Sequence, residues 1–183
     1  MNKCTILNFS SRENGNCARI GEYLLNYYQN KATVFTIDAN NFAPCNTCNY
    51  QCLKPEMLCP QLNHEQRKIM DEICNSNLVY FIIPNYCGLP SANYFAFNER
   101  SVGYFNLDRE KTNLYKKIKK RFIIVSNTEG FDQYMQYQVN NTPDILYLKS
   151  SKYRKQSIAG DILDSEDARS ALNAFLAFDL SNE

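Results

Sequence analysis

The residues between the first apolar segment and the first helical pattern have the types and the order of a phosphate-binding loop. Ser10, Ser11 and Arg12 are followed by Gly15, and Asn16 then opens a helical pattern. The first backbone N–H groups of a helix have no intrahelical partner and carry partial positive charge, so they attract anions. Serine hydroxyls donate hydrogen bonds, arginine pairs with charged oxygens, and glycine permits a tight turn. The loop predicts either the phosphate site of a mononucleotide or an ordinary polar turn between a strand and a helix.

A second group of reactive side chains lies in a stretch without clear periodicity, at about residues 40–62. Four of the eight cysteines fall there, at Cys45, Cys48, Cys52 and Cys59. Thiolates clustered in a loop can hold an iron–sulfur cluster or a tetrahedral zinc ion. The alternative is a set of reduced thiols that pack a loop, because free cysteine also behaves as a small apolar residue.

Length and composition restrict the class of protein. The 183 residues (1–183) suit a single domain with a substantial core, and a formal net charge of +1 predicts no affinity for nucleic acid. The sequence shows neither a signal-peptide pattern at its start nor an apolar run long enough to span a bilayer. We therefore expect a cytoplasmic protein without membrane contact, whose cysteines are thiols or metal ligands rather than disulfides.

Segments with strand and helix patterns alternate along the chain. The expected strands are residues 3–9, 33–38, 77–84, 121–126 and 144–148. The expected helices are residues 16–30, a helix capped by Asn63, residues 91–99, 108–120 and 133–139, and a last helix capped by Asp164 or Ser165. Pro84 is expected to end the third strand, and residues 101–107 are expected to be irregular.

This alternation predicts an α/β protein with a three-layer, doubly wound, flavodoxin-like fold and a five-stranded parallel sheet. In such a fold ligands bind beyond the carboxyl ends of the strands, where the strand order reverses. The loops after the first, third and fourth strands should therefore meet. Gly15, Gly88 and Gly130 lie one in each of these loops, where glycine lets the backbone approach a flat ligand.

Two of these loops resemble those of the flavodoxin-like, NAD(P)H-dependent FMN reductases. That family opens with Gly-Ser-Pro-Arg and then has Gly-Asn-Thr at the helix start. The matching residues here are 9–12 (Phe-Ser-Ser-Arg) and 15–17 (Gly-Asn-Cys). The family's second signature, Ser-Pro-x-Tyr-x-Gly-x-x-Ser-Ala, corresponds to residues 83–92. Phe9 and Cys17 depart from the pattern, and Cys17 lacks a hydroxyl that would usually contact phosphate.

The resemblance implies FMN as the cofactor, NAD(P)H as the co-substrate and a homodimer. Electrons would pass to a small acceptor such as a quinone, a nitro compound, free flavin or a metal ion. The flavin itself carries the hydride chemistry, so no catalytic side chain is required, and His64 is expected to be a surface or capping residue. The residues expected to bind the flavin are Ser10, Ser11, Arg12, Asn16, Cys17, Ala18, Pro84, Asn85, Tyr86, Cys87, Gly88, Asn127, Thr128 and Gly130.

Two other functions stay open at this point. Iron–sulfur flavoproteins related to this family carry a four-cysteine motif at the same place, so Cys45, Cys48, Cys52 and Cys59 could hold a [4Fe–4S] cluster. Such a protein would relay electrons to a protein partner. The third hypothesis is a non-enzymatic flavodoxin-like module that binds a partner through the cysteine loop and the aromatic segment.

Overall fold

The computed structural model of the chain describes residues 3–45, 48–54, 59–105, 108–127, 144–156 and 160–180. Five parallel strands form its central sheet in the spatial order β2-β1-β3-β5-β6, and a two-residue strand, β4, pairs antiparallel with β3. This order is that of the flavodoxin-like doubly wound fold, so the predicted fold class is confirmed. The strands are β1 (Cys4–Asn8), β2 (Ala32–Thr36), β3 (Leu78–Tyr86), β4 (Leu89–Pro90), β5 (Lys119–Ser126) and β6 (Asp144–Lys149).

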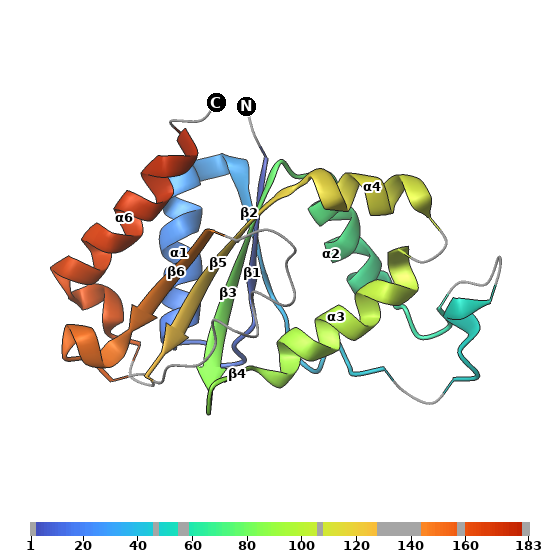
Figure 1. The fold of residues 1–183 in the computed structure, drawn as a ribbon, viewed down its shortest axis with the longest axis horizontal. Coiled ribbons are helices and arrows are strands. Elements are labelled where there is room, and N and C mark those ends of the chain that lie inside the picture. The colour runs from blue at the N-terminus through green and yellow to red at the C-terminus, as the bar shows by residue number, and fades with distance from the viewer. Residues whose placement is uncertain are drawn as a thin grey trace.

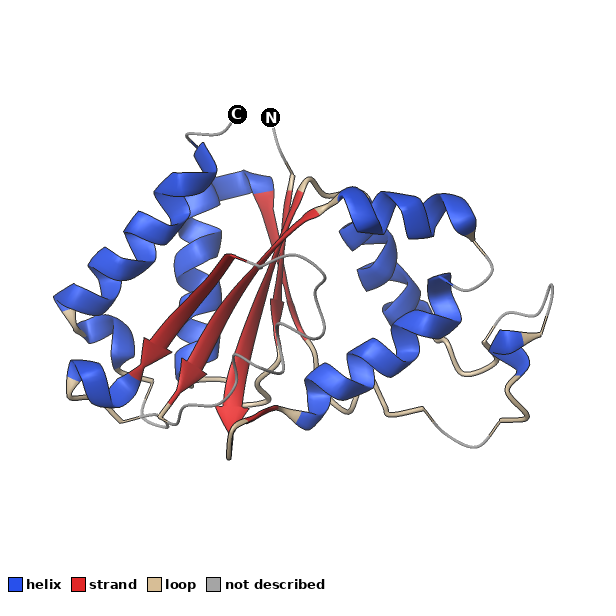
Figure 2. Ribbon diagram, in the orientation of Figure 1, coloured by secondary structure: helices blue, strands red, loops and turns tan. Residues whose placement is uncertain are grey.

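Helices cover both faces of the sheet, which makes three layers (Figure 1). One face carries α1 (Asn16–Tyr28) and α6 (Glu166–Leu180). The other face carries α2 (His64–Cys74), α3 (Ala92–Phe105) and α4 (Arg109–Lys117). The five parallel strands end at the same edge of the molecule, as Figure 2 shows. In the described part of the chain, no helix is long and apolar enough to cross a membrane.

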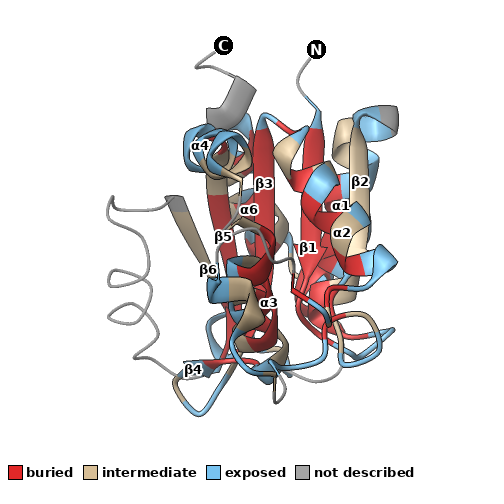
Figure 3. Ribbon diagram, turned by 90° about the vertical axis from the view of Figure 1, so that its right-hand side faces the viewer, coloured by how far each residue is buried: buried red, intermediate tan, exposed pale blue. Residues whose placement is uncertain are grey.

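The middle strand, β3, is the centre of the core (Figure 3). Its side chains alternate between the two faces, so one continuous apolar run supplies two apolar clusters. Val79, Phe81 and Ile83 pack on the side of α2 and α3, and Tyr80 and Ile82 pack on the side of α1 and α6. This burial on both faces is what the continuous apolar pattern of the strand predicts.

Three elements have boundaries that differ clearly from the predictions. The helix expected at residues 108–120 ends at Lys117, because β5 already begins at Lys119 and pairs there with β3. β3 does not end at Pro84 but continues to Tyr86, because the chain turns back and the last two residues of the strand pair with β4. The segment Ser101–Phe105, expected to be irregular, is the last part of α3. The helix continues because it buries Tyr104, whose hydroxyl donates to Asp71 on α2.

Two leucines on the helices are partly exposed, and one predicted helix cannot be compared. Leu25 on α1 is 37 % exposed and Leu114 on α4 is 42 % exposed. Leu25 lines a groove with Val34 of the edge strand β2, and among the described residues no further strand lies beyond β2 to cover it. The helix predicted at residues 133–139 lies outside the described residues. His64 is exposed as the first residue of α2, as expected.

Candidate functional site

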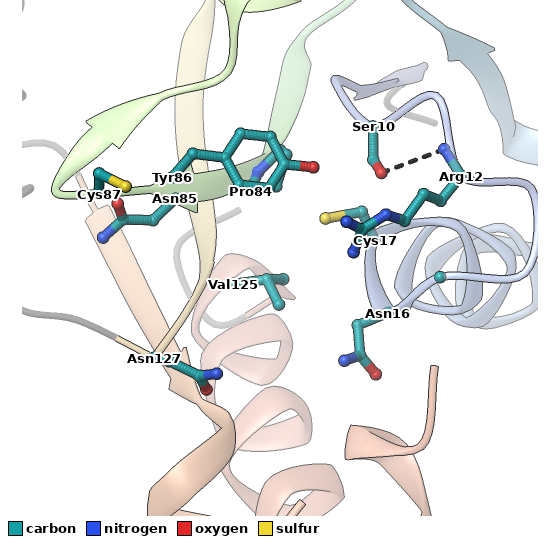
Figure 4. A pocket seen from close by; sticks show the side chains of 11 residues that line it. Ser10, Arg12, Asn16, Cys17, Pro84, Asn85, Tyr86, Cys87, Val125 and Asn127 are labelled. Atoms are coloured by element: carbon teal, nitrogen blue, oxygen red, sulfur yellow. Dashed lines mark hydrogen bonds between the residues drawn. The ribbon is translucent and has the colours of Figure 1, made fainter. Parts of the chain in front are cut away.

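The loops after β1, β3 and β5 meet at the carboxyl edge of the sheet around one cavity (Figure 4). Its volume is about 220 Å³. That is below the roughly 300–1,000 Å³ of sites that enclose a small ligand, so a ligand bound here would stay partly exposed. The residues that line this three-loop cavity are Ser10, Arg12, Gly15, Asn16, Cys17, Pro84, Asn85, Tyr86, Cys87, Val125 and Asn127.

Three of the described residues expected at the site do not line this cavity, and two others cannot be compared. Ser11 and Ala18 line a separate groove on the β2 side of the phosphate loop. Gly88 lies in the turn between β3 and β4. Thr128 and Gly130 lie outside the described residues. The predicted loops are therefore brought together, but the first of them faces two hollows rather than one.

The phosphate loop is held in shape by its own polar side chains. The Ser10 N–H donates to Asn8 Oδ1 at 3.0 Å, and the Arg12 N–H donates to Ser10 Oγ at 3.3 Å. Because Ser10 Oγ accepts in this contact, its hydroxyl hydrogen stays available to a ligand. The guanidinium of Arg12 extends over the cavity (Figure 4). One hydroxyl and one permanent positive charge thus face the same space.

The N-terminus of α1 opens into this cavity without a side-chain cap. Gly15 occupies the N-cap position with φ −80° and ψ 171°, and it has no side chain to accept the first-turn N–H groups. A Cβ atom added at Gly15 would lie 3.1 Å from Arg12 Cβ, which is a tight contact. The glycine therefore allows the arginine to pack against the helix end, and it leaves the helix N–H groups to an anion.

Asn16 lines the cavity, and its side chain also holds the fold together. It is buried, its Nδ2 donates to the Gln156 carbonyl at 3.2 Å, and its Oδ1 accepts from the Ile162 N–H at 2.8 Å. These bonds tie the segment between β6 and α6 to the start of α1. Gly160 in that segment has φ +72°, and a Cβ there would lie 2.2 Å from the Asn14 carbonyl oxygen. Only glycine permits this approach.

Cys17 is a neutral thiol at the floor of the cavity. Its burial raises the pKa to about 12, although the nearby charge of Arg12 acts in the opposite direction. A protonated thiol neither attacks an electrophile nor repels an anion. The departure from the family's threonine therefore removes a hydroxyl from the site without adding negative charge.

The turn between β3 and β4 forms the opposite wall. Asn85 Oδ1 accepts from the Gly88 N–H at 2.9 Å, and Asn85 Nδ2 donates to Ser126 Oγ at 2.7 Å. Cys87 and Gly88, the two residues of the turn, have positive φ angles of 54° and 84°. This is the geometry of a two-residue hairpin of type I′. Asn85 thus fixes the turn and joins it to the end of β5.

The same hairpin presents an exposed apolar surface beside the cavity. Tyr86 is 45 % exposed and Leu89 is 53 % exposed, and the two residues pair across the turn. Figure 4 shows the ring of Tyr86 reaching from β3 toward the phosphate loop. A flat, partly apolar ligand could lie against this edge while its charged end reaches Arg12.

The cysteine loop lies away from this cavity, beyond α3 (Figure 1). Cys59 is buried, Cys48 and Cys52 are half-buried, and Cys45 is exposed. Burial, and after it the neighbouring thiols of the same loop, raise the pKa of Cys52. Among the described residues, no three His, Cys, Asp or Glu side chains are arranged to hold a metal ion. A metal site at these cysteines stays a prediction.

Two residues of α3 hold the cysteine loop, and sequence patterns did not indicate either. The buried guanidinium of Arg100 donates to the carbonyls of Ala43 and Pro44 at 2.8 and 2.7 Å and to Gln61 Oε1 at 2.8 Å. It therefore fastens both ends of the loop to the helix. A Cβ added at Gly103 would lie 2.7 Å from Cys59 Cβ, so glycine allows the loop to pack closely.

No protein-family model matches the chain, and no curated protein matches its sequence. Solved structures match its fold. The Trp repressor binding protein from Bacillus subtilis is similar over 95 % of this chain and 97 % of that chain, at 15 % identity and a TM-score of 0.64. An NADH:FMN oxidoreductase (EMOB) in its apo form is similar over 96 % of this chain and 88 % of that chain, at 11 % identity and a TM-score of 0.53.

A third similar structure holds a flavin derivative. RosB with bound 8-demethyl-8-formylriboflavin-5′-phosphate is similar over 100 % of this chain and 88 % of that chain, at 11 % identity and a TM-score of 0.54. At identities this low, the likeness establishes the fold alone. The chain is an α/β protein of the flavodoxin-like class, with a hollow at the edge of the sheet where that class of fold binds ligands.

Proposed function

We propose that the chain binds FMN at the three-loop cavity and acts as an NAD(P)H-dependent oxidoreductase that passes electrons to a small acceptor. The observation that carries the proposal is the uncapped N-terminus of α1, which opens into the cavity beside Arg12. A helix N-terminus next to a guanidinium suits a phosphate dianion. Opposite them, the exposed edge formed by Tyr86 and Leu89 suits a flat ring.

The loop sequences and two similar structures support a flavin as this ligand. Residues 9–17 and 83–92 carry the two signatures that resemble those of the FMN reductases. EMOB is an NADH:FMN oxidoreductase, and the RosB structure holds a riboflavin-5′-phosphate derivative. The two lines of support are separate, because one comes from side chains in loops and the other from the backbone fold.

The chain's own residues would bind and orient this cofactor. When bound, FMN supplies the redox chemistry, because its ring exchanges a hydride with nicotinamide and returns two electrons to an acceptor. Ser10 and Arg12 would hold the phosphate by a hydroxyl and a charge. Cys17 stays protonated beneath it and so does not repel it. Asn85 would keep the hairpin in place under the ring through its bonds to Gly88 and Ser126.

The test is a flavin titration followed by reduction. We expect the purified chain to bind FMN, with loss of flavin fluorescence, and the bound flavin to be bleached anaerobically by NADH or NADPH. A chain that does not bind added FMN would overturn the proposal. A chain that binds FMN but is not reduced by either nicotinamide would instead be a flavodoxin-like binding module. Turnover with a quinone, a nitro compound, free flavin or ferric iron would then identify the acceptor.

The homodimer is a proposal that follows from the resemblance, and the cytoplasmic location is a proposal that follows from the sequence patterns. Light scattering on the FMN-loaded chain at several concentrations measures the oligomeric state directly. A mass of one chain at all concentrations would contradict the dimer. Fractionation of cells that produce the untagged chain tests the location.

The cysteine loop supports a second candidate, an iron–sulfur flavoprotein that relays electrons to a protein partner. The supporting observation is that Cys52 and Cys59 pack against the same point of α3, since a Cβ added at Gly103 would lie 3.7 Å from Cys52 Cβ and 2.7 Å from Cys59 Cβ. This candidate predicts iron and sulfide in anaerobically purified protein, both lost in Cys52→Ser. Cys74→Ser is the matched control, because Cys74 is half-buried outside this loop. Yellow protein without iron would exclude the cluster.

A further inference from the structure

A second cavity adjoins the phosphate loop on its β2 side. It has a volume of about 400 Å³ and lies between α1 and the edge strand β2. Ser10 and Arg12 line both this groove and the three-loop cavity, so the two hollows meet at these residues. The volume falls within the range of sites that take a small organic ligand. The proposed flavin site does not account for it.

One part of the groove is apolar. Ala18 and Leu25 from α1 and Val34 from β2 line it. Leu25 is 37 % exposed, whereas the neighbouring Leu24 of the same helix is buried. Val34 is half-buried at the sheet edge. These three side chains form a slot of aliphatic surface. A flat heterocyclic base would bury this surface and gain stability from it.

The other part of the groove is polar and is held by the fold. Asp38 lies two residues beyond the end of β2, and its Oδ1 accepts from the N–H groups of Asn40 and Asn41 at 2.8 and 3.3 Å. In the described part of the chain, both bonds use the same oxygen, which leaves Oδ2 for a ligand. Asn8 joins Thr36 to the phosphate loop through bonds of 3.4 and 3.0 Å, so this wall has a defined shape.

The charges of the groove restrict the ligand. Glu13, Glu22 and Asp38 contribute three carboxylates, and Arg12 contributes the one guanidinium among the residues that line it. A carboxylate beyond the second strand of a parallel sheet is well placed to accept from the hydroxyls of a ribose. It would repel a phosphate group attached to that ribose. Phosphates are favoured only at the end of the groove nearest Arg12.

We propose that this groove binds the adenosine end of a nicotinamide dinucleotide, with the base between Leu25 and Val34 and the ribose diol on Asp38. The pyrophosphate then approaches Arg12, which lines both hollows and whose guanidinium would lie between it and the flavin phosphate and donate to both. This inference rests on the proposed function and names its electron donor. The carboxylates disfavour a 2′-phosphate, so the donor is NADH rather than NADPH.

Calorimetric titration of the full chain with two adenosine probes tests the groove without any redox step. We expect 5′-AMP to bind and adenosine 2′,5′-bisphosphate to bind at least roughly tenfold more weakly. Asp38→Asn keeps an accepting Oδ1 for the turn and removes the charge. This substitution should lower the affinity for 5′-AMP roughly tenfold and reduce the difference in affinity between the two probes. Leu25→Gln, at an exposed helix position, should also weaken AMP.

Kinetics with the FMN-loaded chain give the second measurement. Asp38→Asn should raise the KM for NADH and leave kcat unchanged, because the ribose contact is the same before and during hydride transfer. Glu110→Gln, an exposed carboxylate on α4, is the matched control and should change neither. No binding of AMP, or AMP binding that is indifferent to Asp38→Asn, would overturn the proposal.

The two proposals fail in distinguishable ways. If FMN is reduced by NADPH at least as efficiently as by NADH, the groove assignment is wrong and the oxidoreductase stands. If neither nicotinamide reduces bound FMN while AMP still binds through Asp38, the oxidoreductase is wrong. The groove is then a site for an adenosine phosphate in a protein of another activity.

Discussion

The N-termini of α1 and α2 differ in their capping: a side chain accepts from a first-turn N–H group at α2, and the cap residue of α1 has no such side chain. At α2, Asn63 Oδ1 accepts from the Gln66 N–H at 2.8 Å, and Gln66 Oε1 accepts from the Asn63 N–H at 3.3 Å. This reciprocal pair is a capping box. At α4, Asp108 accepts from the Lys111 N–H at 2.9 Å. At α1 the cap residue is Gly15, which has no side chain to accept such a hydrogen bond.

The difference separates a helix end built for stability from one left for a ligand. A capping side chain contributes about 1 kcal/mol to stability relative to alanine, and glycine forgoes the side-chain hydrogen bond itself. The uncapped end is also the end that opens into the three-loop cavity beside Arg12. If the assignment is right, changes at α1 should affect ligand binding and changes at α2 should affect folding.

The largest effect is expected when α1 receives a cap of its own. In Gly15→Asp the new carboxylate would accept the first-turn N–H groups and repel a phosphate. Loss of two charge-assisted hydrogen bonds at about 1.5 kcal/mol each should lower the affinity for FMN by roughly 100-fold. Fluorescence titration measures this affinity. Gly15→Ala is the control for the added Cβ, which meets Arg12 Cβ at 3.1 Å. Native affinity in Gly15→Asp would contradict an anion at this helix end.

The second-largest effect is expected when the guanidinium of Arg12 is removed. Arg12→Ala should weaken FMN by roughly tenfold, because one hydrogen bond to a charged group contributes about 1.5 kcal/mol. The affinity of the native chain should fall as salt increases, and that of the variant should fall less. Arg109→Ala, an exposed arginine at the start of α4, is the matched control. Equal loss in both variants would mean that Arg12 acts only through the general charge of the surface.

Loss of the cap of α2 should lower the stability of the fold and leave the affinity for FMN unchanged. Asn63→Ala is expected to lower the free energy of unfolding by about 1 kcal/mol, because it opens the capping box. Urea denaturation measures this change, and Asn63→Asp, which keeps an accepting oxygen, should recover most of it. FMN affinity should stay at the native value. A fall in affinity in Asn63→Ala would show that the two helix ends are not independent.

The smallest effect is expected at Asp71, where α2 meets α3 and α4. Burial acts to raise the pKa of Asp71, but hydrogen bonds from Tyr104 and Lys111 and the charges of Lys111 and Arg67 lower it overall. A lowered pKa means that the carboxylate stabilises the fold above its ordinary pKa and loses this contribution as the pH falls. The side chain is 51 % exposed, so solvent screens most of the effect.

Acid unfolding of the Asp71→Asn variant tests whether the pKa of Asp71 is lowered in the folded chain. The free energy of unfolding of the native chain should fall slightly more than that of the variant between about pH 6 and about pH 3. Glu110→Gln, on the neighbouring helix, serves as the control. A variant that loses more stability than the native chain on acidification would show that the pKa is raised instead.

The elements predicted correctly are those whose signal is contained in a short stretch. β3 is a continuous apolar run, and the capping box of α2 needs only Asn63 and Gln66. The boundaries that were wrong depend on distant partners. β3 passes Pro84 because β4 returns to it, and α3 continues past Glu99 because Tyr104 reaches Asp71. Sequence patterns contain no record of such partners.

The candidate site divides in the same way. Ser10, Arg12 and Gly15 are recognisable as a phosphate loop from their types and order, and the structure places them at one cavity. Asn16 was expected at the site and lines the cavity, but nothing near it in the chain shows that its side chain also bonds to Gln156 and Ile162. Gly160 was missed because nothing near it in the chain shows that Asn14 would approach it.

The sequence by itself determined the alternation of strands and helices and the chemistry of each loop, because hydrophobic periodicity and residue type are local properties. Only the tertiary structure decided that the phosphate loop separates two hollows, that Leu25 and Asp38 share one of them, and that α1 keeps an open end facing Tyr86. Those relations arise from parallel crossovers that bring distant strand ends to one edge of the sheet.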